Sequence, residues 1–244
     1  LGGQVDALLQ EYRDNRLLAG LGPKTFELLR PHLRTTSLNA GVTLCQAGSN
    51  IEQVYFPHSG LVSLLVATDD GQAVETTIVG REGAVGLQAG LGPRRSFTLA
   101  VTQIGGNFSV ISASRLCGIV RNDPTLRDII VRYIETCWAE AQQSAACNAA
   151  HDASARFCHW LLQCADSIGG DEVALTQDAF AQMLTVRRTT ITQLAQSLQE
   201  LGYIRYRRGC LRILDREGLK KKACDCSNVL QGANTQVSIS PEMD

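Results

Sequence analysis

Residues 187–193 are the stretch of this sequence whose side chains are best suited to chemistry with a polyanion. Two arginines, three threonines and a glutamine lie here with no acidic residue among them. Guanidinium, hydroxyl and amide groups bond phosphate oxygens and the edges of bases. We therefore expect a nucleic-acid-binding surface made of Arg187, Arg188, Thr189, Thr190, Thr192 and Gln193. The alternative is the solvated face of an ordinary helical hairpin.

Two short helices with a tight turn between them, over residues 175–202, are predicted to carry this surface. Thr176 can cap the first helix, because its side-chain oxygen can accept a backbone N–H of the first turn. Gly202 ends the second helix. Apolar residues at helical spacing form the inward faces: Phe180, Met183, Leu184, Ile191, Leu194, Leu198 and Leu201. A second helix that is basic at its N-terminal end is typical of a helix-turn-helix that enters a major groove.

Residues 203–214 follow as a small predicted hairpin that turns near Arg208-Gly209. A basic wing beside a recognition helix is expected to contact phosphates, here through Arg205, Arg207 and Arg208, with Thr176 as a further backbone contact. The local charge agrees with this expectation. Residues 171–222 carry 10 basic and 6 acidic residues, whereas the whole chain has a net charge of −1.

The composition is that of an ordinary globular protein, with 44% hydrophobic and 19% charged residues. No apolar run approaches the roughly 20 residues that a membrane span needs, and no basic-plus-apolar leader opens the chain. A cytoplasmic protein with no membrane partner is therefore expected. The sequence contains no nucleophile–base–acid constellation and no phosphate-binding loop, so an enzyme is not expected.

Upstream of the helix-turn-helix the pattern changes from helical to strand-like and back. Residues 1 to about 34 are predicted to be helical. Short apolar or alternating runs then recur at residues 42–45, 54–56, 61–66, 74–79, 97–101 and 108–111, and Asp69-Asp70-Gly71 is a strong hairpin signal. Strands at this spacing predict an antiparallel sandwich or barrel, and the whole chain is thus of the α+β class.

A single helix of roughly 27 residues, about 40 Å long, is predicted to follow Asp123-Pro124. Residues spaced three and four apart form a stripe along this helix. The stripe is apolar at its start and consists of small and polar residues further on. Such a stripe resembles a coiled-coil dimer seam, and the alternative is a helix packed on its own domain. The seam prediction includes Ile130, Tyr133, Cys137, Ala141 and Ser144.

Taken together, the chain resembles the Crp/Fnr superfamily of bacterial transcription regulators over about residues 15–220. The most specific segments are residues 54–60 (VYFPHSG), 79–86 (VGREGAVG) and 175–214. The resemblance implies a jelly-roll sensor domain similar to cyclic-nucleotide-binding domains at 1–122, a dimerisation helix at 123–151 and a winged helix-turn-helix at 152–222. Residues 223–244 are expected to form a mobile tail.

The resemblance also implies a function and the residues that perform it. A homodimer would regulate transcription by binding a near-palindromic DNA site, and activation would add contact with RNA polymerase. The family's base-reading positions fall on Arg188, Thr189 and Gln193. The family's usual acid at Thr189 and arginine at Gln193 are replaced, so the operator sequence does not carry over. The alternative function is a ligand-binding module that acts on a protein partner without DNA.

The sensor domain departs further from the cyclic-nucleotide-binding members of the superfamily. The Arg-Ser pair that holds the cyclic phosphate falls on Arg95 and Ser96, a candidate site for an effector anion. The acid that bonds the ribose falls on Val85, and the base-contacting pair falls on Ala141 and Gln142. Two of three contact groups are changed, so neither cyclic AMP nor another cofactor is predicted.

Nine cysteines are scattered along the chain, and small buried thiols are their expected role. Cys224 and Cys226 form a close pair, but two ligands do not make a metal site, so no metal is predicted. A redox-sensing role remains open for Cys45 or Cys210.

Overall fold

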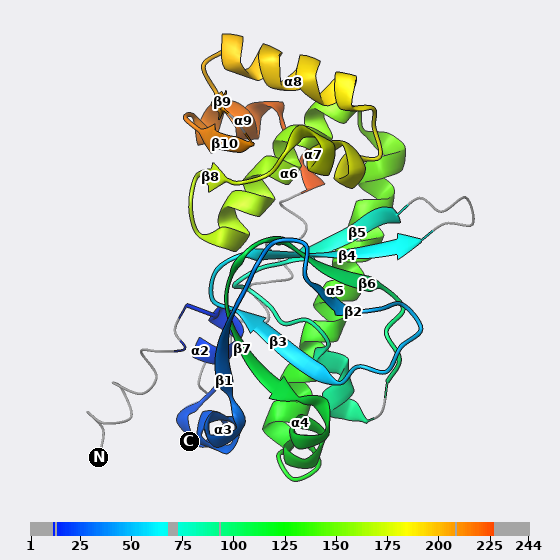
Figure 1. Cartoon of the computed structure of the whole chain (residues 1–244), viewed down its shortest axis with the longest axis vertical. Helices are drawn as coiled ribbons and strands as arrows, with labels where there is room; N and C mark the ends of the chain where they lie inside the picture. The colour runs from blue at the N-terminus through cyan, green and yellow to red at the C-terminus, as the bar shows by residue number, and fades with distance from the viewer. Residues whose placement is uncertain (1–11, 13, 68–72, 93, 208, 227–244) are drawn as a thin grey trace.

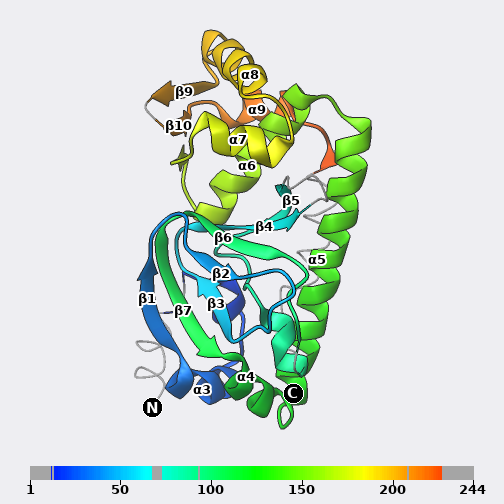
Figure 2. The same ribbon diagram turned by 45° about the vertical axis from the view of Figure 1, so that its right-hand side comes forward.

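The computed structural model describes residues 12, 14–67, 73–92, 94–207 and 209–226. A β-rich half and a mainly helical half lie end to end, and the long helix α5 (Pro124–Ala150) runs beside both of them (Figures 1 and 2). Among the described residues, none of the helices is both long and apolar enough to cross a bilayer.

The β-rich half is an antiparallel roll of two sheets, as the sequence predicts. One sheet has the order β1-β7-β3 and the other β2-β6-β4-β5. The strands are β1 (Arg34–Leu38), β2 (Thr43–Cys45), β3 (Gln53–Pro57), β4 (Leu61–Ala67), β5 (Ala73–Val79), β6 (Leu99–Ile104) and β7 (Gly106–Ser112). The flanking short helices are α2 (Arg16–Ala19), α3 (Pro23–Leu29), η1 (Arg30–His32), η2 (Leu87–Leu91) and α4 (Ala113–Val120).

Side-chain alternation along β7 divides the apolar residues between two cores. Phe108 and Val110 point between the sheets and pack with Val62 and Ala100 of the opposite sheet. Ile111 points the other way, into a core built with the N-terminal helices, α4 and α5. Both faces of this sheet are therefore covered, and α5 is attached to the roll by its first turns.

The helical half is a winged helix-turn-helix, which confirms the predicted architecture. It consists of α6 (Ala153–Ile168), β8 (Glu172–Val173), α7 (Gln177–Leu184), α8 (Arg188–Glu200), β9 (Ile204–Arg207), β10 (Cys210–Ile213) and α9 (Arg216–Lys222). Strand order in the wing is β8-β10-β9. Phe180 lies at the centre of its core and meets the rings of Phe157 and Trp160 edge-on, at centroid distances of 5.5 and 5.3 Å.

Several element predictions needed correction. Strand β1 and helix α9 were not predicted, and the run predicted at 97–101 begins as a strand only at Leu99. Leu201, expected to point inward, is 48% exposed at the end of α8. The turn at Asp69-Asp70-Gly71 and most of the predicted tail lie outside the described residues.

The predicted dimer seam is wrong for its first two residues. Ile130 is fully buried and packs on the roll's own helices, close to Leu116 and Gly90. The Tyr133 hydroxyl donates to the Ala84 carbonyl and accepts from the Ala84 N–H, both at 2.9 Å. These side chains face the sensor domain of their own chain because α5 packs there, which is the alternative that the sequence left open. Cys137 and Ser144 are half-buried, and only Ala141 of the set is exposed.

Candidate DNA-binding interface

Helix α8 lies at the outer edge of the molecule, at the end opposite α4 (Figure 1). Its inward face is apolar, and Ile191, Ala195 and Leu198 are buried. The predicted base-reading residues Arg188, Thr189 and Gln193 are all exposed. The sequence pattern thus orients the helix: the apolar positions bury one side, and the polar N-terminal half is left in solvent.

The turn before α8 is set by Thr185, which has a left-handed backbone conformation with φ 53°. Its N–H and that of Val186 bond the last carbonyls of α7, which ends that helix. Arg187 follows with an extended backbone as the residue before the first turn of α8, and it provides no side-chain cap. The first N–H groups of α8 and two arginines therefore lie together at one exposed end, an arrangement that favours an anion.

Two of the predicted contact residues, Arg188 and Thr192, interact with side chains of α7. Arg188 Nη1 lies 3.1 Å from Asp178 Oδ2 in an exposed ion pair. Thr192 Oγ1 donates to Gln177 Oε1 at 2.8 Å. An exposed pair of this kind contributes about 0–1 kcal/mol, so Arg188 can leave it for a stronger acceptor. These bonds hold the side chains of the surface in place before any ligand arrives.

Thr176 has a structural task that the sequence also predicted. Its Oγ1 accepts from the Ala179 N–H at 3.2 Å and caps α7. The residue is exposed, as a contact to the DNA backbone requires.

The wing presents its arginines on one face. Arg205 lies opposite Arg212 in the β9–β10 register, and Arg207 is two residues further along the same strand. All three are exposed, while Ile204, Leu211 and Ile213 point into the core. Gln199 Oε1 of α8 accepts from the Tyr206 N–H at 2.8 Å, which fastens the wing to the helix. Arg208, a predicted contact, lies outside the described residues.

Two family matches cover most of the described chain. Residues 35–122 match the cyclic nucleotide-binding domain, and residues 155–222 match the Crp-like helix-turn-helix domain. Together they span more than half of the sequence, in the order that the structure displays. The chain belongs to the Crp/Fnr family. Members are DNA-binding transcriptional regulators with a sensor domain, and they are not enzymes.

Individual relatives of this Crp/Fnr regulator are distant. The CRP-like cAMP-activated global transcriptional regulator of Mycobacterium tuberculosis is 23% identical over 85% of this chain and 96% of its own length. The structure of FixK2 from Bradyrhizobium japonicum superimposes with a TM-score of 0.69 at 15% identity, covering 79% of this chain and 98% of FixK2. The c-di-GMP responsive regulator CLP of Xanthomonas campestris superimposes with a TM-score of 0.63 at 16% identity, covering 79% of this chain and 99% of CLP.

The sensor residues of this Crp/Fnr regulator do not form a common anion pocket. Ser96 is 6% exposed, and its hydroxyl donates to the Thr98 carbonyl at 2.7 Å. Arg95 is exposed. Val85, at the position of the ribose-binding acid, packs between the sheets, where it offers no polar group. Arg95 thus lies in solvent, Ser96 bonds its own turn and Val85 lies in the core, so these predicted residues do not come together.

The sensor roll and the winged domain meet at a junction lined by β5, α5 and α6. Trp160 Nε1 of α6 donates to Glu75 Oε1 of β5 at 2.9 Å, and Ser63 donates to the other carboxyl oxygen. Burial raises the pKa of the Glu75 carboxyl to about 7. The two hydrogen bonds lower the pKa and offset only part of that rise. The pKa of Glu140 on α5 is also raised to about 7, first by burial and then by the charge of Glu82. A cavity of about 70 Å³ lies between these groups.

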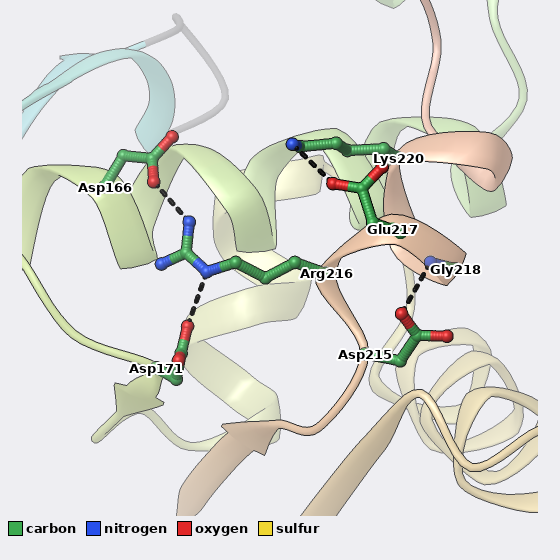
Figure 3. Close-up of polar contacts among 7 residues, drawn as sticks. All are labelled: Asp166, Asp171, Asp215, Arg216, Glu217, Gly218 and Lys220. Carbon is green, nitrogen blue, oxygen red and sulfur yellow. Dashed lines mark hydrogen bonds and ion pairs between the residues drawn. The ribbon is translucent and has the colours of Figure 1, made fainter.

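Helix α9, which the sequence analysis missed, is fixed to the rest of the winged domain by Arg216. Its Nη1 lies 2.5 Å from Asp166 Oδ1 of α6, and its Nε lies 2.7 Å from Asp171 Oδ1 (Figure 3). Asp215 caps the helix by accepting from the Gly218 N–H at 2.9 Å. Gly218 is required because a Cβ there would lie 2.5 Å from the Tyr203 ring. The sequence did contain a signal for this helix, because an aspartate at the N-cap and basic residues in the last turn are typical of helix ends.

The cysteine pair after α9 is not isolated, although the sequence analysis counted only these two ligands. Cys147 and His151, at the end of α5, lie beside Cys224 and Cys226. The missed signal was the spacing of Cys147 and His151 by four residues, which places Cys147 in the last turn of α5 and His151 directly after that helix.

Proposed function

We propose that two copies of this chain bind a near-palindromic duplex, each with its α8 in a major groove. The observation that carries the proposal is the exposed N-terminal half of α8, backed by a fully buried apolar face. In this role Arg188 bonds a guanine bidentately, Gln193 bonds an adenine, and Thr189 contacts a neighbouring base. The two half-sites are then about 34 Å apart, one turn of the duplex.

The surrounding polar residues contact the phosphates of the DNA backbone. Arg187 and Thr190 flank the base-reading residues, and Thr176 and Thr192 lie at the edge of α7 and α8. Arg205 and Arg207 extend the same basic surface onto the wing, with Arg208 assigned to it from the sequence. Binding at such a site represses by occupancy alone, whereas activation adds a contact with RNA polymerase.

The homodimer contact lies on the exposed face of α5 rather than on the stripe that includes Ile130. Trp138 is 68% exposed and Val131 is 37% exposed. Exposed Glu135, Gln142 and Ala145 complete a series with spacings of four and three, which is the repeat of a two-helix seam. A Trp138→Glu variant tests this face: sedimentation should report a monomer, with the fold retained in circular dichroism. A dimer of unchanged stability would contradict the assignment.

The signal read by the sensor domain is a ligand other than cyclic AMP. Val85 is apolar and packed between the sheets, so the acid that bonds the ribose is replaced, and the Ser96 hydroxyl bonds its own turn. Named relatives respond to different molecules, cAMP in one and c-di-GMP in another. Calorimetric titration with cyclic AMP should show no binding, and saturable binding at micromolar concentration would contradict this part of the proposal.

Coupling between signal and DNA passes through α5 and the junction. The two halves of the chain share α5, and β5 contacts α5 and α7 and bonds α6 through Glu75 and Trp160. A ligand that changes the pairing of the α5 helices would change the separation and tilt of the two α8 helices.

A salt-dependent binding assay with duplex DNA tests the proposal against the alternative of a module that acts on a protein partner. Contacts to phosphates release counterions, so the affinity should fall steeply with added salt. Absence of DNA binding at low salt, with and without ligand, would favour the protein-partner function and refute the DNA-binding one.

A further inference from the structure

The end of α5 and the segment after α9 bring four metal-ligating side chains together. Cys147 lies in the last turn of α5 and His151 directly follows that helix. Cys224 and Cys226 follow α9, more than 70 residues further along the chain. The four donor atoms all lie within 4.8 Å of one another, a grouping that spacing along the chain does not impose.

Two of the distances within this group are close to those in a tetrahedral metal site. Cys147 Sγ lies 3.4 Å from Cys224 Sγ, and Cys226 Sγ lies 3.6 Å from His151 Nδ1. Zinc bonds of about 2.3 Å to sulfur and about 2.0 Å to nitrogen separate tetrahedral ligands by about 3.8 Å for two sulfurs and about 3.6 Å for sulfur and nitrogen. These two pairs would need shifts of only a few tenths of an ångström to hold a metal, and the other pairs, which lie within 4.8 Å, would close by at most about 1 Å.

The three thiols of the site are built into the fold, and the imidazole lies at the surface. Cys147, Cys224 and Cys226 are 7%, 7% and 4% exposed and form a small packing cluster with Ala155, separate from the main cores, whereas His151 is exposed. The Cys226 backbone also hydrogen-bonds the Cys224 sulfur. Buried thiols with a backbone donor aimed at one of them are suited to hold the negative charge of metal-bound thiolates.

Rigid elements fix both halves of the site. The His151 N–H bonds the Cys147 carbonyl at 3.1 Å, and Asp152 caps α6 immediately afterwards, so the α5–α6 corner is fixed. Arg216 and its two aspartates hold α9 on α6 (Figure 3), which positions the residues that follow it. The ligands are thus positioned by backbone bonds and by ion pairs that leave their side-chain donor atoms available.

We propose that Cys147, His151, Cys224 and Cys226 bind one zinc ion. Three thiolates and an imidazole are the ligand set of structural zinc sites, and sulfur ligands exclude the hard cations magnesium and calcium. All four positions of the tetrahedron are filled by protein, so the ion has no open position for a substrate. The ion ties the end of α5 to the last helix of the winged domain.

The ligand set leaves the site with a net charge of −1, and nearby lysines offset it. Lys220, Lys221 and Lys222 form the last turn of α9, next to Cys224. The proposal does not depend on DNA binding, because it rests on the ligand geometry alone.

Metal analysis of the full chain, purified under reducing conditions, tests the proposal. About one zinc per chain is expected for the wild type and for the control Cys117→Ser, whose thiol lies on α4 outside the cluster. Cys226→Ser should retain less than a tenth of that zinc. A chain that holds no zinc and takes up neither Zn²⁺ nor Co²⁺ would overturn the proposal, as would an iron–sulfur chromophore or a Cys147–Cys224 disulfide in place of the metal.

If Cys226→Ser fails to fold, replacing one metal-binding residue by another still tests the proposal. His151→Cys retains four donors and should still bind one metal ion. Replacing zinc by cobalt should then give stronger sulfur-to-cobalt charge-transfer absorption in His151→Cys than in the wild type. Identical cobalt spectra for the two proteins would exclude His151 as a ligand and overturn the proposed set.

Discussion

The recognition surface of α8 and the buried junction at the opposite side of the winged domain are built in contrasting ways. On α8, residues 187–193 are neighbours in sequence, and two of those that face solvent, Arg188 and Thr192, make exposed bonds to α7. At the junction, Glu75 meets Trp160 and Cys147 meets Cys224, pairs separated by 85 and 77 residues. The first surface needs one helix to be correctly oriented, whereas the second needs the whole chain to be folded.

This contrast predicts different consequences of mutation. Substitutions on α8 should change what the protein binds and leave its stability nearly unchanged, because exposed ion pairs contribute little. Substitutions at the junction should change stability and the relation between the two halves, because buried polar groups lose their partners there.

Removal of the proposed zinc should give the largest loss of stability. At free zinc a thousandfold above the dissociation constant, binding stabilises the folded state by about 4 kcal/mol. Denaturant unfolding of the chelator-treated wild type should therefore show a loss of this size, reversed by added zinc. The Cys226→Ser protein should show the same loss but no response to zinc. A chelator effect as large in Cys226→Ser as in the wild type would place the metal elsewhere.

Glu75 should make stability depend on pH. Its pKa is about 7 in the folded protein, against 4.5 for an ordinary glutamate. Between these values the folded state binds more protons than the unfolded state, so the free energy of unfolding falls as pH rises from about 4.5 to about 7, by up to about 3 kcal/mol. Glu75→Gln keeps a neutral amide in place and should be more stable than the wild type at pH 8.

The control for that experiment is Glu52→Gln, which removes an exposed carboxylate from the sensor roll. Glu140 titrates in the same direction, so a reduced pH dependence should persist in Glu75→Gln. Equal pH slopes for wild type and Glu75→Gln would contradict the role given to Glu75.

Arg188→Ala should weaken specific DNA binding by about 1–3 kcal/mol and relax the preference at one base pair in each half-site. The cause is the loss of a bidentate contact to a base. The melting temperature of the protein should be nearly unchanged, because the Arg188–Asp178 pair is exposed. Asp178→Asn serves as the matched control, since it breaks the same ion pair but keeps the base-reading arginine. A uniform loss across all sequences would show that Arg188 contacts phosphate instead.

Arg207→Ala should have the smallest effect, a similar weakening of binding to every sequence. Removing one phosphate contact should reduce the slope of log affinity against log salt by about 1. Anisotropy titrations at several salt concentrations measure this slope, and Leu214→Ala, an exposed uncharged position beyond the wing, is the control. A change in base preference would move Arg207 into the base-reading set.

The same contrast explains what could be predicted from the sequence. The period of Ile191, Leu194 and Leu198 orients α8 by itself, and the polar face follows from it. Asp123-Pro124 marks the start of α5, because an Asp cap followed by Pro at the first helical position is a local signal.

Long-range contacts could not be read in this way. The stripe that includes Ile130 resembles a dimer seam in the sequence, because a helical period reveals a buried face but not what buries it. Cys224 and Cys226 stand as an isolated pair in the sequence, because only the folded chain brings Cys147 and His151 to them. Strand β1 was missed because its exposed and half-buried residues carry no strong apolar alternation.

Selection of bound sequences from a random duplex pool, with Arg188→Ala carried through the same rounds, is the most direct test of DNA recognition by α8. We expect enrichment of sites with two inverted half-sites about 10 base pairs apart, and loss of preference at one position in each half when Arg188 is replaced. A wild-type pool that shows no enrichment at low salt would contradict this expectation, as would an Arg188→Ala pool with unchanged preferences.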